Sequence, residues 1–152
     1  MAFKRWLYRG GHPNQLAKIL NHGWAFVHAL GVAPNYMVTL DVAGRQSGKT
    51  ISFPLAMVTM DGKRYLVSML GENANWVRNL EAADGKARLR HGKTEDVCLV
   101  PVAIDQRPPI LKRYLQVAPG ARPHIPVDKD APIDEFTQIA PQYPVFRVDR
   151  LA

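Results

Sequence analysis

The chain has 152 residues, of which 47% are hydrophobic and 22% are charged, a balance typical of a globular protein and not of a disordered one. This length suits one domain, so we expect a single domain over residues 1–152. The single cysteine, Cys98, excludes an internal disulfide and a cysteine-based zinc site. No apolar run approaches the ~20 residues that span a bilayer, and we expect a cytoplasmic protein.

Residues 1–34 form a basic segment within a chain of net charge +7. The segment contains Lys4, Arg5, Arg9 and Lys18 and no Asp or Glu. Apolar residues at helical spacing predict a helix over residues 14–30. Two roles stay open for residues 1–30: weak peripheral contact with an anionic membrane surface, or packing over the open end of the fold.

The next segments predict three antiparallel strands in a meander. Residues 36–42 alternate apolar and polar side chains, and a strand over residues 51–60 is joined by the turn pair Asp61-Gly62 to one over residues 64–70.

The second half of the chain predicts a helix from Asn73 or Asn75, as the N-cap, to a stop at Gly85. The remaining elements are expected in this order: strands at 86–91 and 94–104, a helix at 108–118, a long irregular loop at 119–132, a short helix at 132–139 and a strand at 144–151. Cys98 is expected to be a buried strand residue. The fold class is α+β, mainly β: a six-stranded antiparallel barrel with short helices packed outside.

The stretch from Ala43 to Thr50 has the relaxed spacing of a phosphate-binding P-loop. A P-loop must be followed by a helix, whose N-terminal N–H groups face the phosphates. Pro54 would fall in the second turn of that helix, in a segment otherwise rich in strand formers. We therefore expect a loop followed by a strand, and not a nucleotide triphosphate site.

The sequence lacks the residue patterns that most catalytic mechanisms need. The five histidines are scattered, so no helical metal pair is present, and no Gly-x-Ser-x-Gly elbow occurs. No aromatic-basic pattern for nucleic acid is seen. If the protein is an enzyme, a bound cofactor carries the reaction. What remains is the cationic loop at residues 44–50, whose composition fits an anion site and a solvated hairpin loop equally well.

Three linked motifs favour the first of these interpretations. They are the Gly-Arg-x-Ser-Gly loop at 44–48, Pro54-Leu55 six residues after it, and Trp76-x-x-Asn79-Leu80 on the predicted helix. Together they resemble the deazaflavin (F420)-dependent nitroreductase and quinone reductase family of actinobacteria, whose members have a flavin-reductase-like split β-barrel. The resemblance runs from about residue 36 to residue 104, with a weaker part near the C-terminal strand.

The resemblance implies coenzyme F420 as the cofactor, and it implies which residues hold it. Arg45, Ser47, Gly48, Lys49 and Thr50 would bind the anionic tail; Ser52, Phe53, Pro54 and Leu55 would line the ring; Met69, Leu70 and Gly71 would supply backbone contacts; and Asn75, Trp76, Arg78 and Asn79 would close the pocket.

The implied function is hydride transfer from reduced F420 to a small electron-poor acceptor, such as a quinone, a nitro compound or an activated enone. Tyr114 and Tyr143 are candidate proton donors, with solvent as the alternative donor. Two other functions stay open: an FMN-binding oxidoreductase on a related barrel, and a non-catalytic F420 carrier. The acceptor and the oligomeric state stay open too, a dimer included.

Overall fold

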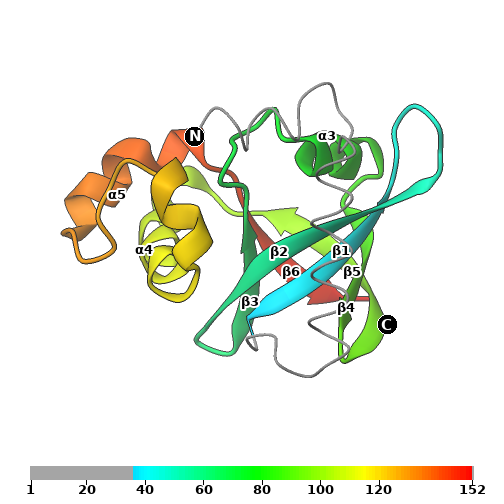
Figure 1. Cartoon of the computed structure of the whole chain (residues 1–152), viewed down its shortest axis with the longest axis horizontal. Helices are drawn as coiled ribbons and strands as arrows, with labels where there is room; N and C mark the ends of the chain where they lie inside the picture. The colour runs from blue at the N-terminus through cyan, green and yellow to red at the C-terminus, as the bar shows by residue number, and fades with distance from the viewer. Residues whose placement is uncertain (1–35, 152) are drawn as a thin grey trace.

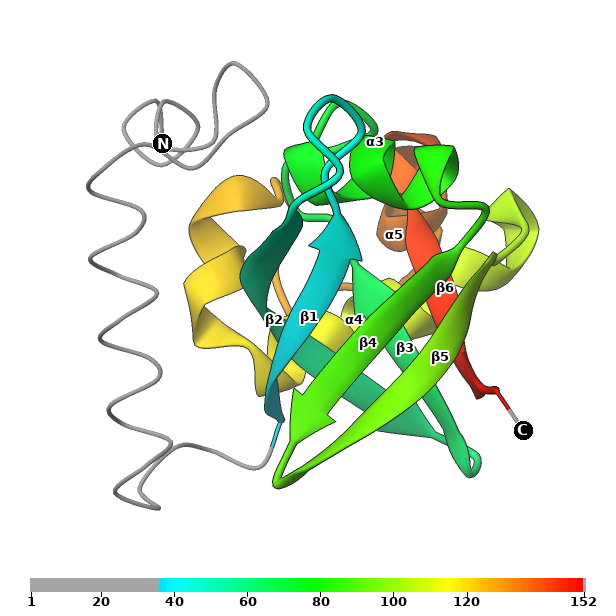
Figure 2. The same cartoon turned by 90° about the vertical axis from the view of Figure 1, so that its right-hand side faces the viewer.

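The computed structural model describes residues 36–151, in which six antiparallel strands form a closed barrel (Figures 1 and 2). The strands follow one another around the barrel in the order β1-β2-β3-β6-β5-β4. Their bounds are β1 Met37–Ala43, β2 Thr50–Met60, β3 Lys63–Val67, β4 Lys86–His91, β5 Lys93–Pro101 and β6 Val145–Arg150. The predicted fold class is confirmed. The predicted helix at 14–30 and the basic segment 1–34 lie outside the described residues.

In residues 36–151, three α-helices accompany the barrel: α3 Asn75–Ala82, α4 Arg107–Val117 and α5 Ile133–Ile139. In Figure 1, α3 lies over one end of the barrel, whereas α4 and α5 lie beside it. Short 3-10 turns cover Ile104–Gln106, Pro119–His124 and Ala140–Gln142. None of the helices in residues 36–151 combines the length and the hydrophobicity that a membrane span needs.

The local turn signals act as predicted. Asp61 and Gly62 both adopt positive φ, 51° and 76°, as a two-residue hairpin turn of type I′ requires, and they connect Met60 to Lys63 across the ladder. Thr50 through Met60 form a strand and not a helix, so the structure excludes the P-loop interpretation.

Two apolar cores result from the alternation of side chains along the strands. Inside the barrel, residues such as Val38, Leu40 and Phe53 pack with the buried face of α3. Outside it, Val58, Val67 and Val145 pack against α4 and α5. The helical layer is therefore held by the outer faces of β2, β3 and β6.

Some expectations about local structure need correction. The N-cap of α3 is Ala74, whose side chain has no polar atom to cap the helix, so neither predicted cap, Asn73 or Asn75, takes this position. Asn75 is the first helical residue, and its carboxamide oxygen accepts from Arg45. Cys98 is half-buried and not fully buried.

The predicted element bounds also change. The strand predicted over residues 94–104 spans Lys93–Pro101, and Ile104–Gln106 form a 3-10 turn. The strand predicted to reach residue 70 ends at Val67, and the hydroxyl of Ser68 then donates to the carbonyl of Gly71 at 2.6 Å. Within the predicted loop 119–132, residues 119–124 form 3-10 helix, and Arg122 ties it to the carbonyl of Leu115 at 3.0 Å.

Candidate functional site

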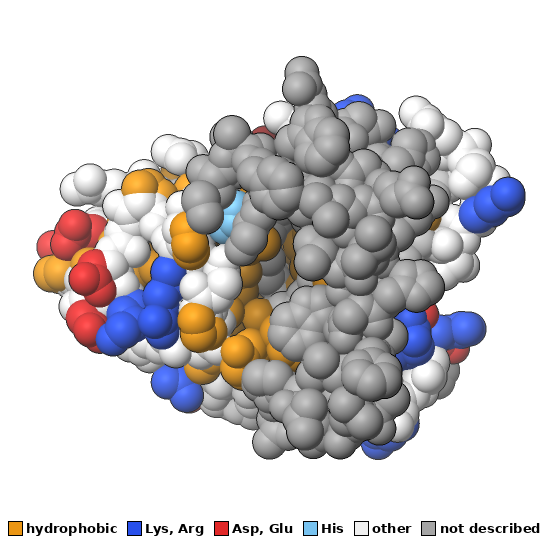
Figure 3. Space-filling model, viewed as in Figure 1, with side chains coloured by type: hydrophobic (Ala, Val, Ile, Leu, Met, Phe, Trp, Pro, Cys, Tyr) orange, Lys and Arg blue, Asp and Glu red, His pale blue; other side chains and the backbone are white. Residues whose placement is uncertain are grey.

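A cavity of about 430 Å³ lies where the barrel meets the helical layer. The first half of β2, the end of β3, the start of α3 and the C-terminal part of α4 with the turn that follows it meet around the cavity. In the space-filling view, hydrophobic side chains gather at this border between barrel and helices (Figure 3). The described residues that line the cavity are Tyr36, Met37, Phe53, Pro54, Leu55, Ala56, Val67, Met69, Leu70, Ala74, Asn75, Trp76, Tyr114, Ala118, Pro119, Gly120 and Ala121.

The structure brings part of the predicted site to this cavity. The predicted residues that line it are Phe53, Pro54, Leu55, Met69, Leu70, Asn75, Trp76 and Tyr114. Trp76 also belongs to the barrel core, where its ring meets Phe146 edge-on with the ring centroids 5.5 Å apart. The side chain of Trp76 thus contributes both to the barrel core and to the cavity wall.

The sequence interpretation missed the far wall of the cavity. Ala118, Pro119, Gly120 and Ala121 line it, although they lie in a segment without a recognisable motif. Ala56 was missed as well, although its position two residues after Pro54 puts it on the same face of β2. The two-residue period of a strand was the signal that could have identified Ala56 from the sequence.

The cationic loop is a tight turn that exposes its polar side chains. The N–H of Gly44 donates to the carbonyl of Lys49 at 2.8 Å, and the N–H of Gly48, at φ 74°, donates to the carbonyl of Gly44 at 2.9 Å. Ser47, Gly48, Lys49 and Thr50 are all exposed, and none of them lines the cavity. Their predicted role in binding an anionic tail outside the cavity stays a prediction.

Arg45 differs from the rest of the loop because its guanidinium points at α3. Its Nη1 donates to Oδ1 of Asn75 and to Oδ1 of Asn79, each at 2.7 Å. The backbone N–H of Arg45 donates to the same oxygen of Asn79 at 3.2 Å. The loop is therefore fixed to the helix that closes the barrel end.

Within residues 36–151, the NH₂ groups of the two carboxamides have no hydrogen-bond partner. Nδ2 of Asn75 and Nδ2 of Asn79 are buried and have no hydrogen-bond acceptor in the described part of the chain. Buried polar groups are nearly always paired in folded proteins, so the unpaired NH₂ of Asn75, a residue of the cavity wall, favours a ligand acceptor in the cavity.

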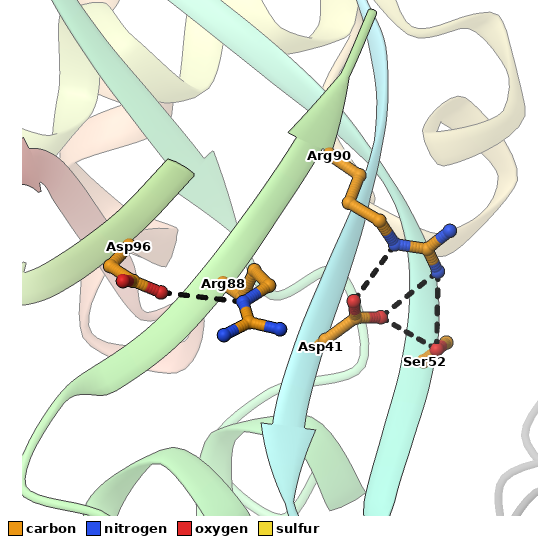
Figure 4. A network of polar contacts seen from close by, with 5 residues as sticks. All are labelled: Asp41, Ser52, Arg88, Arg90 and Asp96. Carbon is orange, nitrogen blue, oxygen red and sulfur yellow. Dashed lines mark hydrogen bonds and ion pairs between the residues drawn. The ribbon is translucent and has the colours of Figure 1, made fainter. Parts of the chain in front are cut away.

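The remaining predicted residues lie away from the cavity wall. Ser52 donates to Oδ1 of Asp41 at 2.6 Å and also accepts from Arg90 on the outer face of the barrel (Figure 4). Arg78 is exposed on α3, and Gly71 forms a turn at φ 89°. Tyr143 is buried among the helices, and its hydroxyl donates to the carbonyl of His124 at 3.2 Å.

Tyr114 is the candidate proton donor that lines the cavity. Burial raises the pKa of its phenol well above the ordinary value, because a phenolate would lose its hydration there. The hydroxyl therefore stays protonated at neutral pH. It is suited to donate a hydrogen bond and poorly suited to release its proton.

The donor set fits the coenzyme that the sequence resemblance implies. A mainly apolar cavity suits a planar ring system, and the buried NH₂ of Asn75, a residue of the cavity wall, suits a carbonyl oxygen of such a ring. The exposed cation Lys49 suits an anionic tail that extends outside the cavity.

Solved structures with the same fold have low sequence identity to this chain. The protein Atu2129 from Agrobacterium tumefaciens, described as of unknown function, matches with a TM-score of 0.56 and 15% identity over 78% of this chain. The chain spans about half of that protein, 49% of its length. A protein described as a domain-swapped dimer matches with a TM-score of 0.55 and 18% identity, over 89% of this chain and 100% of its own.

An F420-H2 dependent reductase, FDR-A, matches with a TM-score of 0.50 and 21% identity, over 75% of this chain and 94% of its own. At these identities the likeness shows the shared fold alone. A comparison with curated protein sequences found no match.

The family comparison is more specific. The model of the F420H(2)-dependent quinone reductase family matches residues 18–133, about three quarters of the chain. The matched range contains the cationic loop, the helix α3 and the cavity walls described above. The chain therefore belongs to the F420H(2)-dependent quinone reductase family, whose coenzyme, F420, is the cofactor that the sequence motifs imply.

Proposed function

We propose that this protein is an oxidoreductase that transfers hydride from reduced F420 to a small electron-poor acceptor: a quinone, a nitro compound or an activated enone. The observation that carries the proposal is the apolar cavity flanked by buried carboxamide donors and by a cationic loop, within the matched family range. An apolar wall with a few polar groups is typical of sites for planar organic ligands.

Each part of the site has its own role in the proposal. Phe53, Pro54, Leu55 and Trp76 hold the ring system and exclude water from it. Met69 and Leu70, which follow β3 and line the cavity, bring backbone groups to the ring, and Gly71 forms the turn that sets their position. Ser47, Gly48, Lys49 and Thr50 bind the anionic tail outside the cavity, where solvent access keeps their contribution dependent on salt. Arg78, exposed on α3, adds a second cation near the rim.

Reduction of a quinone to a quinol consumes one hydride and one proton. Reduced F420, when bound, supplies the hydride. The phenol of Tyr114 holds its proton firmly, so its role is to donate a hydrogen bond that polarises the acceptor. Tyr143 does not line the cavity, and its hydroxyl donates to the carbonyl of His124. Solvent is therefore the proposed source of the proton.

Anaerobic oxidation of reduced F420 in the presence of a soluble quinone, a nitroarene or an enone tests the function. The proposal expects turnover that requires both protein and acceptor, and that is lost in Ala56→Phe, which fills the cavity. Ala43→Phe, on the exposed end of β1, is the matched control and should retain activity. Binding of F420 without turnover of any acceptor would favour a carrier, and turnover with reduced FMN alone would favour the flavin alternative.

The location and assembly of the protein rest on the sequence. We propose one domain over residues 1–152, in the cytoplasm, with weak, salt-reversible contact between residues 1–30 and an anionic membrane surface. Co-sedimentation with anionic vesicles at low and high salt, with the full chain and with a variant lacking residues 1–11, tests the contact. Pelleting that is unchanged by salt and by the deletion would contradict it. The oligomeric state stays open, and sedimentation velocity measures whether the protein is a dimer.

A further inference from the structure

The environment of Arg45 is unusual for a residue expected to bind an anion. Both protons of its Nη1 are directed at carboxamide oxygens, and no carboxylate pairs with its guanidinium within residues 36–151. The side chain is half-buried and does not line the cavity. Its contacts are with the protein itself, namely with two side chains of α3 one helical turn apart.

These contacts determine which way the two carboxamides face. Oδ1 of Asn75 and Oδ1 of Asn79 each accept from Arg45, and a flipped carboxamide would set its NH₂ against the guanidinium, donor against donor. The NH₂ groups are thereby turned away from Arg45. Asn75 and Asn79 are each 1% exposed, and neither NH₂ group has an acceptor within residues 36–151.

Only one of the two carboxamides belongs to the cavity wall. Asn75 lines the cavity, and Asn79, one turn further along α3, does not. Of these three residues, only Asn75 lies where its carboxamide can contact a ligand in the cavity. Asn79 and Arg45 contact each other and do not line the cavity.

We propose that Arg45 is a positioning residue and not an anion ligand. It docks the loop at residues 44–49 on α3 and orients the Asn75 carboxamide, so that its NH₂ donates to a carbonyl oxygen of the ligand ring in the cavity. The proposal rests on the proposed function for the identity of that ligand. The two cations of the loop thus have different roles. Lys49 binds the anionic tail, and Arg45 orients Asn75, which binds the ring.

Two ligands separate these roles: F420 itself, and the deazaflavin chromophore that lacks the phosphate and glutamate tail. Their binding is measured by fluorescence titration. Arg45→Ala should weaken both ligands by the same factor, about tenfold for a lost buried hydrogen bond to the ring. Lys49→Ala should weaken F420 and leave the truncated ligand unchanged. Arg45→Lys, which keeps one nitrogen with several protons, should restore part of the loss. An Arg45→Ala variant that loses affinity for F420 alone would overturn the proposal, because Arg45 would then be a tail ligand.

A pair of isosteric variants tests the role of Asn75. Asn75→Asp and Asn79→Asp both keep an oxygen for Arg45, both remove an NH₂ group and both add the same charge. Asn75→Asp should weaken the truncated ligand about tenfold or more, whereas Asn79→Asp should change it less than threefold. Equal losses in the two variants would contradict the assignment.

The docking of the loop is tested without any ligand. Unfolding of the wild type, Arg45→Ala, Asn79→Ala and the double variant forms a thermodynamic cycle, and the two substitutions should be coupled. Additive effects would overturn the docking role. A wild-type protein that binds neither deazaflavin would contradict the proposed function and the ligand role of Asn75 with it, while the cycle would still report on Arg45 and Asn79.

Discussion

Arg90 on β4 forms a two-bonded ion pair with Asp41 on β1, the strand next to it in the closed barrel. Nε of Arg90 lies 2.8 Å from Oδ2 of Asp41, and Nη2 lies 3.0 Å from Oδ1 (Figure 4). The ladder between β1 and β4 pairs only Thr39–Asp41 with Arg88–Arg90, whereas β1 pairs with β2 along its whole length. The ion pair therefore supports the junction that closes the barrel.

Arg90→Ala should destabilise the protein by about 1 kcal/mol, because the carboxylate of Asp41 is only 13% exposed and would lose its charged partner. The matched control is Arg88→Ala on the same strand. Arg88 pairs with Asp96, and their side chains are 59% and 67% exposed, so this ion pair should contribute less than about 0.5 kcal/mol to stability. Chemical denaturation measures both. Equal losses would mean that Arg90 is an ordinary surface residue.

Among the glycines of residues 36–151, Gly85 is expected to be the most sensitive to substitution. It follows the C-terminus of α3 at φ 82°, where its N–H donates to the carbonyl of Leu80 at 2.9 Å, and an added Cβ would lie 2.7 Å from the carbonyl oxygen of Leu99. Gly85→Ala should cost about 2–4 kcal/mol, from backbone strain together with this clash.

Two further glycines separate the two contributions. Gly92→Ala, at φ 76° with open space around it, should show the strain alone, about 1 kcal/mol. Gly120→Ala, with neither feature, should be near zero. Thermal unfolding gives the ranking, and a Gly85→Ala variant no less stable than Gly92→Ala would show that the chain relaxes around the clash.

The Glu95 carboxylate gives stability a dependence on acid pH. The hydrogen bond from Arg64, at 2.8 Å, holds the pKa of Glu95 below its usual value. The contribution is therefore present above the unfolded pKa of about 4.3 and is lost as pH falls through the lower folded pKa. Glu95→Gln should be less stable than the wild type at pH 7, by about 1 kcal/mol or less, and this difference should disappear as acid pH protonates Glu95 in the folded state. A difference that persists undiminished at low pH would contradict this assignment.

The exposed cation Lys49 should bind the tail of the coenzyme. Lys49→Ala is expected to weaken F420 binding by about 1–3 kcal/mol, the range for a lost charge-assisted hydrogen bond. Added salt should weaken the wild type toward the variant, because exposed charges are screened. The control is Lys93→Ala, an equally exposed cation at the turn between β4 and β5. Equal affinity of Lys49→Ala and the wild type would leave the loop as a solvated hairpin.

Local patterns predicted the barrel but not the shape of its cavity. Alternation at Val38, Leu40 and Val42, the Asp61-Gly62 turn and the stop at Gly85 are short-range signals, and the structure confirms each of them. The wall formed by residues 118–121 depends on where α4 docks, which no local pattern specifies.

The role of Asn75 illustrates the same limit for a single side chain. Its residue type favours a helix cap, but the tertiary contact with Arg45, which is 30 residues away in the chain, takes the carboxamide oxygen instead. The sequence resemblance implied that Arg45 binds the anionic tail, and no local pattern signals its contacts with Asn75 and Asn79 on α3.

Fluorescence titration of the full-length protein with F420 and with FMN tests the central claim most directly, namely that the cavity and the cationic loop form a deazaflavin site. The account predicts that F420 binds at least about tenfold more tightly than FMN, because the loop adds a charged contact for the longer anionic tail. It also predicts that Ala56→Phe, which fills the cavity, abolishes this binding. Tighter binding of FMN than of F420 would contradict it.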